Sequence, residues 1–225
     1  MRLIRAADAD AAAMLAAGEL AAACRAAVDE RGIAVVAVSG GETPWRMLER
    51  LREHALRWER IKVAQVDERV APRGDVRRNL TRLAQVLVTD GPLPGENLLA
   101  MPVEADDLPC AAAQYQHRLE QVAGRPVTFD VVHLGLGADG HTASLVPGDA
   151  ALDVVDRDVA VTGAYQGLRR MTLTFPALNR ARGRLWLVTG AAKAARLAEL
   201  LAGSAAAGLP ALRVSREQAV VIAAD

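Results

Sequence analysis

The fold is decided by residues 131–144, which read VVHLGLGADGHTAS. A short apolar run over residues 129–134 predicts a buried strand, and three glycines then loosen the backbone. Asp139 and His141 follow at the point where such a strand would end. Ligands of open parallel α/β sheets bind outside the carboxyl ends of the strands. A carboxylate and an imidazole that arrive together at this edge are therefore candidates for acid–base catalysis.

Composition is that of an ordinary globular protein. The chain has 225 residues, of which 52% are apolar and 24% are charged, so it can bury a full core. Basic and acidic residues number 27 each, and aromatic residues make up only 3%. Such a chain offers neither a basic surface nor stacking platforms, so we expect it to bind no nucleic acid.

The amino-terminal segment indicates a cytoplasmic location. Asp8, Asp10 and Glu19 interrupt it too early for a secretory leader, and no apolar run reaches the roughly 18 residues that a membrane span needs. We therefore expect no membrane partner. Cys24 and Cys110 are far apart in alanine-rich helical segments, which favours buried thiols in a reducing compartment over a disulfide or a metal site.

Predicted strands and helices alternate along most of the chain. Apolar and β-branched runs predict strands, and helical spacing of apolar residues predicts helices between them. This alternation predicts an α/β fold with a mainly parallel sheet and helices on both faces. The break at residues 91–95 is too short for a linker, so residues 1–225 are expected to form one domain. The strands are predicted at residues 33–38, 61–66, 129–134, 171–175, 185–188 and 220–223, with a further short apolar run at 159–162, and the helices at residues 8–31, 44–54, 76–88, 109–123 and 191–201.

Residues 39–44, Ser-Gly-Gly-Glu-Thr-Pro, follow the first of these buried strands. Thr43 suits a helix N-cap and Pro44 the first helical position. The free N–H groups of Gly40, Gly41 and Thr43 would then meet the positive end of a helix dipole, which suits a phosphate. A tight turn that binds nothing is the other interpretation, and no Gly-Lys-Thr follows to make a Walker loop.

Three other charged segments lie where strands begin or end. Lys193 falls in the first turn of a predicted helix, where a cation opposes the dipole unless an anion is bound nearby. Residues 67–69, Asp-Glu-Arg, end a predicted strand and are either solvated or face the crevice. Arg169 and Arg170 precede another strand, and one of them could reach an anionic substrate. For each segment a solvated surface position remains an alternative.

Residues 135–140 match the dinucleotide fingerprint G-x-G-x-x-G in form. That fingerprint needs a long helix directly after it, whereas Pro147 and Gly148 leave room for two turns only. The glycines are better explained by close approach of a ligand to the backbone.

Only one of the four histidines lies in a setting typical of a functional site. His54 and His117 fall in helical patterns that suggest surface positions, and His133 lies inside the apolar strand, where a core histidine is expected. His141 has no histidine or cysteine at metal-ligand spacing, so no metal is expected.

In this order the segments resemble the glucosamine-6-phosphate isomerase/6-phosphogluconolactonase family, and within it the 6-phosphogluconolactonases. The resemblance covers nearly the whole chain, and residues 139–147 are its most specific part. The matching segments are residues 39–44, 67–69 with Asn79, 135–148, 170–174, and Gly190 with Lys193.

The resemblance implies a fold shared with glucosamine-6-phosphate deaminase and ribose-5-phosphate isomerase. It implies hydrolysis of 6-phospho-D-glucono-1,5-lactone to 6-phosphogluconate, in the oxidative pentose phosphate pathway, without metal or cofactor. The expected partner is this sugar-phosphate lactone, and the chain is expected to be a monomer or a weak homo-oligomer.

Roles for the site residues follow from the same resemblance. His141 would take a proton from water and return it to the leaving oxygen, with Asp139 orienting the ring or holding the sugar. The substrate and its phosphate would be held by Gly40, Gly41, Thr43, Asp67, Arg69, Arg170 and Lys193. Glu42 stands where the family usually has serine, and it is expected to point away from the phosphate because the two charges repel.

Two other functions were weighed. A deaminase of this fold would need a glutamate five residues after the histidine, and Val146 occupies that position. A non-catalytic sugar-phosphate sensor should carry a DNA-binding module and should have lost Asp139 or His141, and neither holds here.

Overall fold

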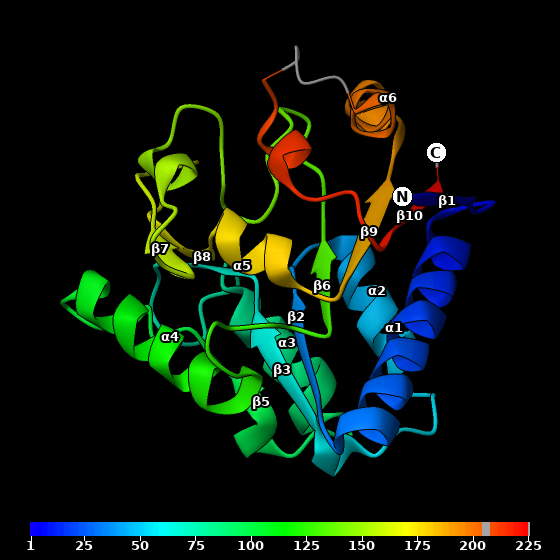
Figure 1. Ribbon diagram of the computed structural model, residues 1–225, viewed down its shortest axis with the longest axis horizontal. Coiled ribbons are helices and arrows are strands. Elements are labelled where there is room, and N and C mark those ends of the chain that lie inside the picture. The colour runs from blue at the N-terminus through cyan, green and yellow to red at the C-terminus, as the bar shows by residue number, and fades with distance from the viewer. Residues whose placement is uncertain (204–207, 225) are drawn as a thin grey trace.

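The computed structural model describes residues 1–203 and 208–224 and is built on a parallel sheet of seven strands (Figure 1). All neighbouring strands of this sheet run parallel, which confirms the predicted mainly parallel α/β fold. In sheet order the strands are β1 (Arg2–Arg5), β10 (Ala219–Ala224), β9 (Gly183–Thr189), β6 (Val131–Leu134), β2 (Ala34–Val38), β3 (Ile61–Gln65) and β5 (Leu98–Leu99).

Helices cover both faces of the sheet, as predicted. Alternate residues of β2 face opposite sides: Val36 joins the core beneath α1 (Ala9–Arg31), α2 (Glu42–Leu51) and α3 (Asn79–Ala84). Val35 joins the other core, which α4 (Leu108–Ala123), α5 (Phe175–Arg180) and α6 (Ala194–Ala202) cover. Both faces of β2 are buried, which explains why its sequence is uniformly apolar.

Helix α1 has the ends that the sequence indicates. Asp8 accepts a hydrogen bond from the Ala11 N–H, and Gly32 closes the helix at a φ of 77°. An 18-residue window of the 23-residue helix α1 has a mean hydropathy of 1.4, so α1 is long and apolar enough to cross a membrane by length and composition alone. Half of that segment is buried in the molecule, as in a core helix.

A second, antiparallel sheet was not predicted. It contains β4 (Asp67–Arg69), β8 (Arg170–Leu173) and β7 (Val159–Val161), in that order. The chain passes from one sheet to the other at Val66, whose N–H donates to Val38 of β2 and whose carbonyl accepts from Leu173 of β8. Residues 67–69 are therefore a strand and not merely the end of one.

Several predicted boundaries differ from those observed. The helix expected at residues 76–88 begins only at Asn79, because the Glu68 carboxylate accepts the Asn79 and Leu80 N–H groups and caps α3 there. A π-helical turn over Gln85–Thr89 completes it. Phe175 begins α5 and does not end a strand, and Lys193 lies in a 3-10 turn before α6.

Three further expectations were wrong or incomplete. Gly41, not Thr43, is the N-cap of α2, and the Thr43 hydroxyl instead lies 2.6 Å from that of Thr189 at the end of β9. Cys24 is buried as expected, but Cys110 is exposed because it lies on the outer face of the first turn of α4. β1 was missed, since its short sequence is largely exposed and lacks an apolar run.

Candidate active site

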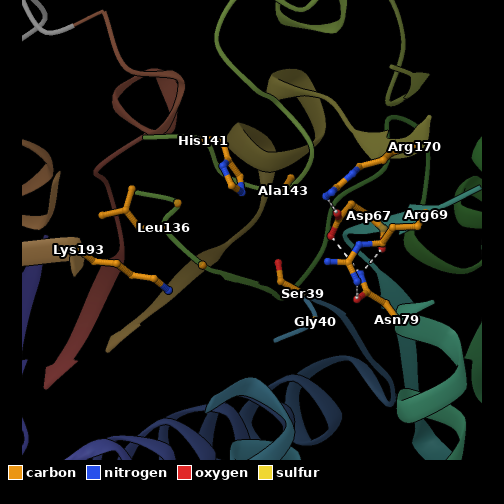
Figure 2. Close-up of a pocket in the computed structure, with 12 residues that line it drawn as sticks. Ser39, Gly40, Asp67, Arg69, Asn79, Leu136, His141, Ala143, Arg170 and Lys193 are labelled. Atoms are coloured by element: carbon orange, nitrogen blue, oxygen red, sulfur yellow. Dashed lines mark hydrogen bonds and ion pairs between the residues drawn. The ribbon is translucent and has the colours of Figure 1, made fainter. Parts of the chain in front are cut away.

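The pocket lies at the point where the order of the parallel strands reverses. From β2 the chain continues to β3 and β5 on one side, and from β6 it continues to β9 and β10 on the other. Ligands of open α/β sheets bind at such a point. The pocket holds about 260 Å³, and its lining comes from segments after β2, β3, β6 and β9 and from β8 (Figure 2). It is lined by Ser39, Gly40, Asp67, Arg69, Asn79, Gly135, Leu136, Gly137, His141, Ala143, Arg170 and Lys193.

His141 and Asp139 form a hydrogen-bonded pair at this pocket. Asp139 Oδ1 lies 2.5 Å from His141 Nδ1 and also accepts the His141 backbone N–H at 3.1 Å. The other oxygen, Oδ2, accepts a hydrogen bond of 3.0 Å from the Tyr165 hydroxyl. With the carboxylate beside Nδ1, the proton of the neutral ring belongs on Nδ1, and Nε2 is left with a free lone pair.

Asp139 is held in its charged form. Burial raises the pKa of its carboxyl, but hydrogen bonds from the His141 backbone, the His141 ring and Tyr165 outweigh that effect, so the net shift is downward. A carboxylate that is ionised at neutral pH can orient the imidazole and would stabilise an imidazolium formed by protonation of Nε2.

Glycine at position 137 is required by the approach of the His141 ring. A Cβ there would lie 2.1 Å from His141 Nδ1, far inside any allowed contact. The loop is closed by the Gly137 N–H, which donates to the His141 carbonyl at 2.9 Å. Ala143, which also lines the pocket, has a φ of 53°, a strained value for a residue with a Cβ. The backbone thus fixes where the ring of His141 can lie.

Two arginines meet on the antiparallel sheet. Arg69 of β4 is directly opposite Arg170 of β8, an arrangement that repels unless negative charge lies nearby. Among the described residues that line the pocket, Asp67 alone has a carboxylate. Its Oδ2 lies 3.9 Å from Arg170 Nη1 and accepts a hydrogen bond of 2.6 Å from the Ser144 hydroxyl. Burial lowers the pKa of Arg170, and Asp67 opposes this shift. One carboxylate against two guanidinium groups leaves room for an anion.

Arg69 is oriented by Asn79. Its Nη1 donates to Asn79 Oδ1 and to the Arg77 carbonyl, each at 2.8 Å, and Asn79 Nδ2 donates to the Asp67 carbonyl at 3.0 Å. Gly40 must be glycine here, since a Cβ would lie 2.0 Å from Asn79 Oδ1. The end of β2 and the start of α3 therefore fit together directly beneath the pocket.

Glu68 supports this side of the site from within the core. Its side chain is 0% exposed and accepts hydrogen bonds from the backbone N–H groups of Arg69, Asn79 and Leu80. It also accepts from the Gln65 amide at 2.9 Å and from Arg78 Nε at 3.4 Å. A buried carboxylate with this many donors fixes the backbone that carries the pocket residues.

Lys193 faces the arginines across the pocket (Figure 2). Burial lowers the pKa of its ammonium group, and among residues 1–203 and 208–224 it forms no ion pair. Together with Arg69 and Arg170 it gives the pocket an excess of positive charge over Asp67. Such a site favours a dianionic ligand.

Most of the residues expected at the site line this pocket. Gly40, Asp67, Arg69, Arg170, Lys193 and His141 do so, and Asp139 lies behind His141. Gly41 is exposed, and the Thr43 hydroxyl is hydrogen-bonded to the Thr189 hydroxyl. Neither Gly41 nor Thr43 lines the pocket. Arg170 is buried at the pocket and Arg169 is exposed, which decides between the two arginines.

Four residues near the ligand space had no role in the sequence analysis: Ser39, Asn79, Ser144 and Tyr165. Ser39 begins the segment of residues 39–44 and Ser144 ends the segment of residues 131–144, so closer attention to the ends of these segments would have found them. Asn79 was noted only as part of the resemblance. Nothing in the local sequence signals Tyr165, which reaches Asp139 from a distant hairpin.

His133 is the core histidine that the sequence predicts. It is fully buried, and burial lowers its pKa to about 4. Its Nδ1 accepts the Ser39 N–H at 3.3 Å, and its carbonyl accepts the Ser39 hydroxyl at 3.0 Å. His133 therefore joins the ends of β6 and β2 beneath the pocket and does not face the ligand space.

The fold and pocket define an α/β protein whose cation-lined pocket suits a small anionic ligand and adjoins a hydrogen-bonded histidine–aspartate pair. More particularly, the chain belongs to the family described as glucosamine-6-phosphate isomerases/6-phosphogluconolactonase, whose model matches residues 7–222. This confirms the family that the motifs of the sequence resemble.

Relatives and solved structures agree with this membership. A 6-phosphogluconolactonase from Synechocystis is 41% identical over 185 residues, which are 80% of this chain and 76% of that protein. The crystal structure of 6-phosphogluconolactonase from Thermotoga maritima superposes with a TM-score of 0.86 at 26% identity, covering 99% of this chain and 98% of the other. A monomeric glucosamine-6-phosphate deaminase shares the fold, with a TM-score of 0.85 at 17% identity over 100% of this chain and 97% of the other.

Proposed function

We propose that this chain is a cytoplasmic enzyme that hydrolyses 6-phospho-D-glucono-1,5-lactone to 6-phospho-D-gluconate in the oxidative branch of the pentose phosphate pathway. The observation that carries the proposal is the hydrogen-bonded His141–Asp139 pair in one pocket with Arg69, Arg170 and Lys193. The names of its relatives, 6-phosphogluconolactonases, support the same activity.

His141 acts first, as a general base. Its Nε2 accepts a proton from a water molecule as the water oxygen attacks the lactone carbonyl carbon. The new C–O bond converts the carbonyl into a tetrahedral oxyanion, while the ionised Asp139 stabilises the imidazolium through Nδ1. The neighbouring cations stabilise the negative charge on the oxygen.

His141 acts again when the intermediate collapses. The bond between the carbonyl carbon and the ring oxygen breaks, and the imidazolium returns its proton to that oxygen, which becomes a hydroxyl group. The carboxylic acid product then ionises at neutral pH, so each turnover releases one proton to the solvent. The histidine is neutral again and ready for the next water molecule.

The phosphate of the substrate is assigned to the cations. Arg69 and Arg170 offer forked guanidinium contacts from one side and Lys193 a point charge from the other (Figure 2). Gly40 brings the backbone close to the same space. We keep Gly41 and Thr43 as weaker phosphate-binding candidates, since Thr43 already shares a hydrogen bond with Thr189.

The deaminase alternative is not favoured by the residue at position 146. Val146 is buried, is absent from the lining of the described pocket, and has no group that can move a proton. The fold alone does not separate the two activities, because a deaminase superposes almost as well as the lactonases.

Proton release from freshly prepared lactone tests the proposal, after subtraction of the spontaneous rate. We expect a large enzyme-dependent rate that a chelator leaves unchanged, because the proposed mechanism uses no metal. Glucosamine 6-phosphate in a parallel assay should yield no ammonia. Ammonia release without lactone hydrolysis would instead identify a deaminase.

The state of association is proposed to be a monomer or a weak homo-oligomer. Light scattering over a range of protein concentrations measures the mass directly, and a tight oligomer at the lowest concentration would contradict the proposal.

A further inference from the structure

We propose that Tyr165 is a positioning residue with two separable tasks: its hydroxyl orients the Asp139–His141 pair, and its ring supports Arg170. The inference rests on the proposed function, because it assigns Tyr165 a role toward the proposed base and the proposed phosphate site. Tyr165 does not line the pocket itself. It acts through residues that do.

The hairpin that carries Tyr165 joins β7 to β8. Tyr165 and Leu168 form its last paired residues, with N–H···O distances of 2.9 and 3.3 Å. Gln166 and Gly167, between them, both have positive φ values of 52° and 80°. Positive φ at both central residues is the mark of a type I′ turn, whose twist matches that of the two strands. The turn therefore holds Tyr165 in a defined position over the site.

The hydroxyl of Tyr165 completes the hydrogen bonding of Asp139. Oδ1 of that carboxylate serves His141, and Oδ2 accepts the Tyr165 hydroxyl at 3.0 Å. The ring of Tyr165 also meets the imidazole edge-on, with centroids 5.4 Å apart and an angle of 66° between planes. Because His141 binds one carboxylate oxygen and Tyr165 binds the other, the carboxylate cannot rotate away from the imidazole. Burial and the Asp139 carboxylate raise the pKa of Tyr165, so its phenol remains a donor at neutral pH.

The ring of Tyr165 faces Arg170. The Arg170 guanidinium carbon lies 5.0 Å from the ring centroid, within the range of a cation–π contact. Its other side-chain contacts are long: 3.4 Å to Ser144, 3.4 Å to Gln166 and 3.9 Å to the Asp67 carboxylate. The aromatic face therefore contributes substantially to placing this cation.

The Tyr165 side chain thus contacts both the Asp139–His141 pair and Arg170 of the proposed phosphate site. Its hydroxyl and its ring can be removed in separate steps, and each step should change a different kinetic constant. Loss of the hydroxyl frees Asp139 to rotate and should lower kcat. Loss of the ring frees Arg170 and should raise KM.

Tyr165→Phe removes the hydroxyl alone. We expect kcat to fall about 3- to 10-fold, the effect of one hydrogen bond, with KM changed less than about 2-fold. Without the Tyr165 hydroxyl, Asp139 Oδ2 loses a hydrogen-bond partner and the carboxylate can rotate relative to the imidazole, so the NMR signal of the His141 Nδ1 proton should move from its wild-type position. The charged groups that line the pocket, Asp67, Arg69, Arg170 and Lys193, are unchanged in this variant.

Tyr165→Leu removes both the hydroxyl and the aromatic ring. We expect the same fall in kcat and, in addition, a rise of about 3- to 10-fold in KM, with a matching loss of affinity for inorganic phosphate. Ala164→Ser is the matched control, because this exposed neighbour in the same hairpin should behave as wild type.

Two readouts do not depend on the reaction and keep the inference separate from the proposed function. If no lactone is hydrolysed but the signal of the His141 Nδ1 proton and phosphate binding change as described, the proposed function fails and the role of Tyr165 stands. If wild type is active and Tyr165→Phe changes neither kcat nor that signal, the inference is overturned. Should Tyr165→Leu fail to fold, Tyr165→Phe still decides.

Discussion

The two sides of the pocket are built in different ways. His141 lies on a loop after a strand of the parallel sheet, and its side chain is 24% exposed. Arg170 and Asp67 lie within strands of the antiparallel sheet, and their side chains are 6% and 7% exposed. The first side depends on glycines that let a ring approach the backbone, and the second on buried hydrogen bonds.

The two sides of the pocket therefore have different proposed tasks: the loop with His141 serves the reaction, and the strands with Arg170 and Asp67 also support the fold. The loop side carries His141 and Asp139, the proposed acid–base pair, and few buried contacts depend on that pair. On the strand side, Glu68 accepts hydrogen bonds from the backbone of β4 and of the start of α3, so the segments that carry the proposed phosphate-binding residues also support the fold. Substitutions on the loop side should therefore change rates more than stability, and those beneath the strand side should change stability as well.

The largest effect is expected from His141→Asn. Loss of a general base should reduce kcat by about 100- to 10,000-fold while the free energy of unfolding stays close to that of wild type. Lactone hydrolysis above the spontaneous rate and urea unfolding measure the two quantities. His117→Asn, at an exposed histidine of α4, is the control. Near-normal turnover in His141→Asn would remove His141 from the mechanism.

Glu68→Gln should act on stability. The amide cannot accept all the N–H groups that the buried carboxylate accepts, and it leaves Arg78 without one of its partners, so we expect unfolding to become easier by about 3 kcal/mol. Glu49→Gln, which breaks a surface pair with Arg82, should cost less than about 1 kcal/mol. Equal effects of the two changes in urea unfolding would contradict the supporting role of Glu68.

His133 should make the protein less stable in mild acid. The folded protein binds a proton on this ring only below about pH 4, whereas the unfolded chain binds it below about pH 6.5. Unfolding therefore takes up a proton between these values, and the free energy of unfolding should fall by about 2 kcal/mol from pH 6.5 to pH 5.

His133→Asn tests the origin of that dependence. Asparagine keeps an acceptor near the Ser39 N–H but does not titrate, so the variant should be less stable at pH 7 and lose less stability on acidification. Urea unfolding at both pH values gives the comparison. The same loss in both proteins would mean that other groups cause it.

The smallest effect is expected from Arg170→Lys. The charge stays, but the forked donors and the contact with the Tyr165 ring are lost, so KM should rise about 10-fold with a smaller change in kcat. Arg169→Lys is a closely matched control, since its side chain is exposed beside the same strand. If both variants raise KM equally, Arg170 is not the arginine that holds the phosphate.

Much of the fold could be predicted because runs of apolar residues and helix-capping residues indicate strands and helices locally. The apolar strands β2 and β6 and the capped helix α1 were found close to their true bounds. Of the site, His141, Asp139 and Lys193 were found because each follows a parallel strand, and such strands end at a common edge. The runs that become β7 and β8 were noticed, but their antiparallel pairing with each other and with β4 was missed, since β4 has only three residues and its pairing with β8 joins segments about 100 residues apart.

The order of apolar runs, glycines and charged residues determined by itself the parallel α/β fold, the family and the candidate base His141, because all three depend on neighbours in the chain. Only the tertiary structure decided that Arg170 and not Arg169 lines the pocket, that Thr43 pairs with Thr189, and that Tyr165 reaches Asp139. These contacts join residues that lie far apart in the chain or face opposite sides of a strand. These contacts depend on strand register and on the packing of one sheet against another, and no local sequence pattern predicts either.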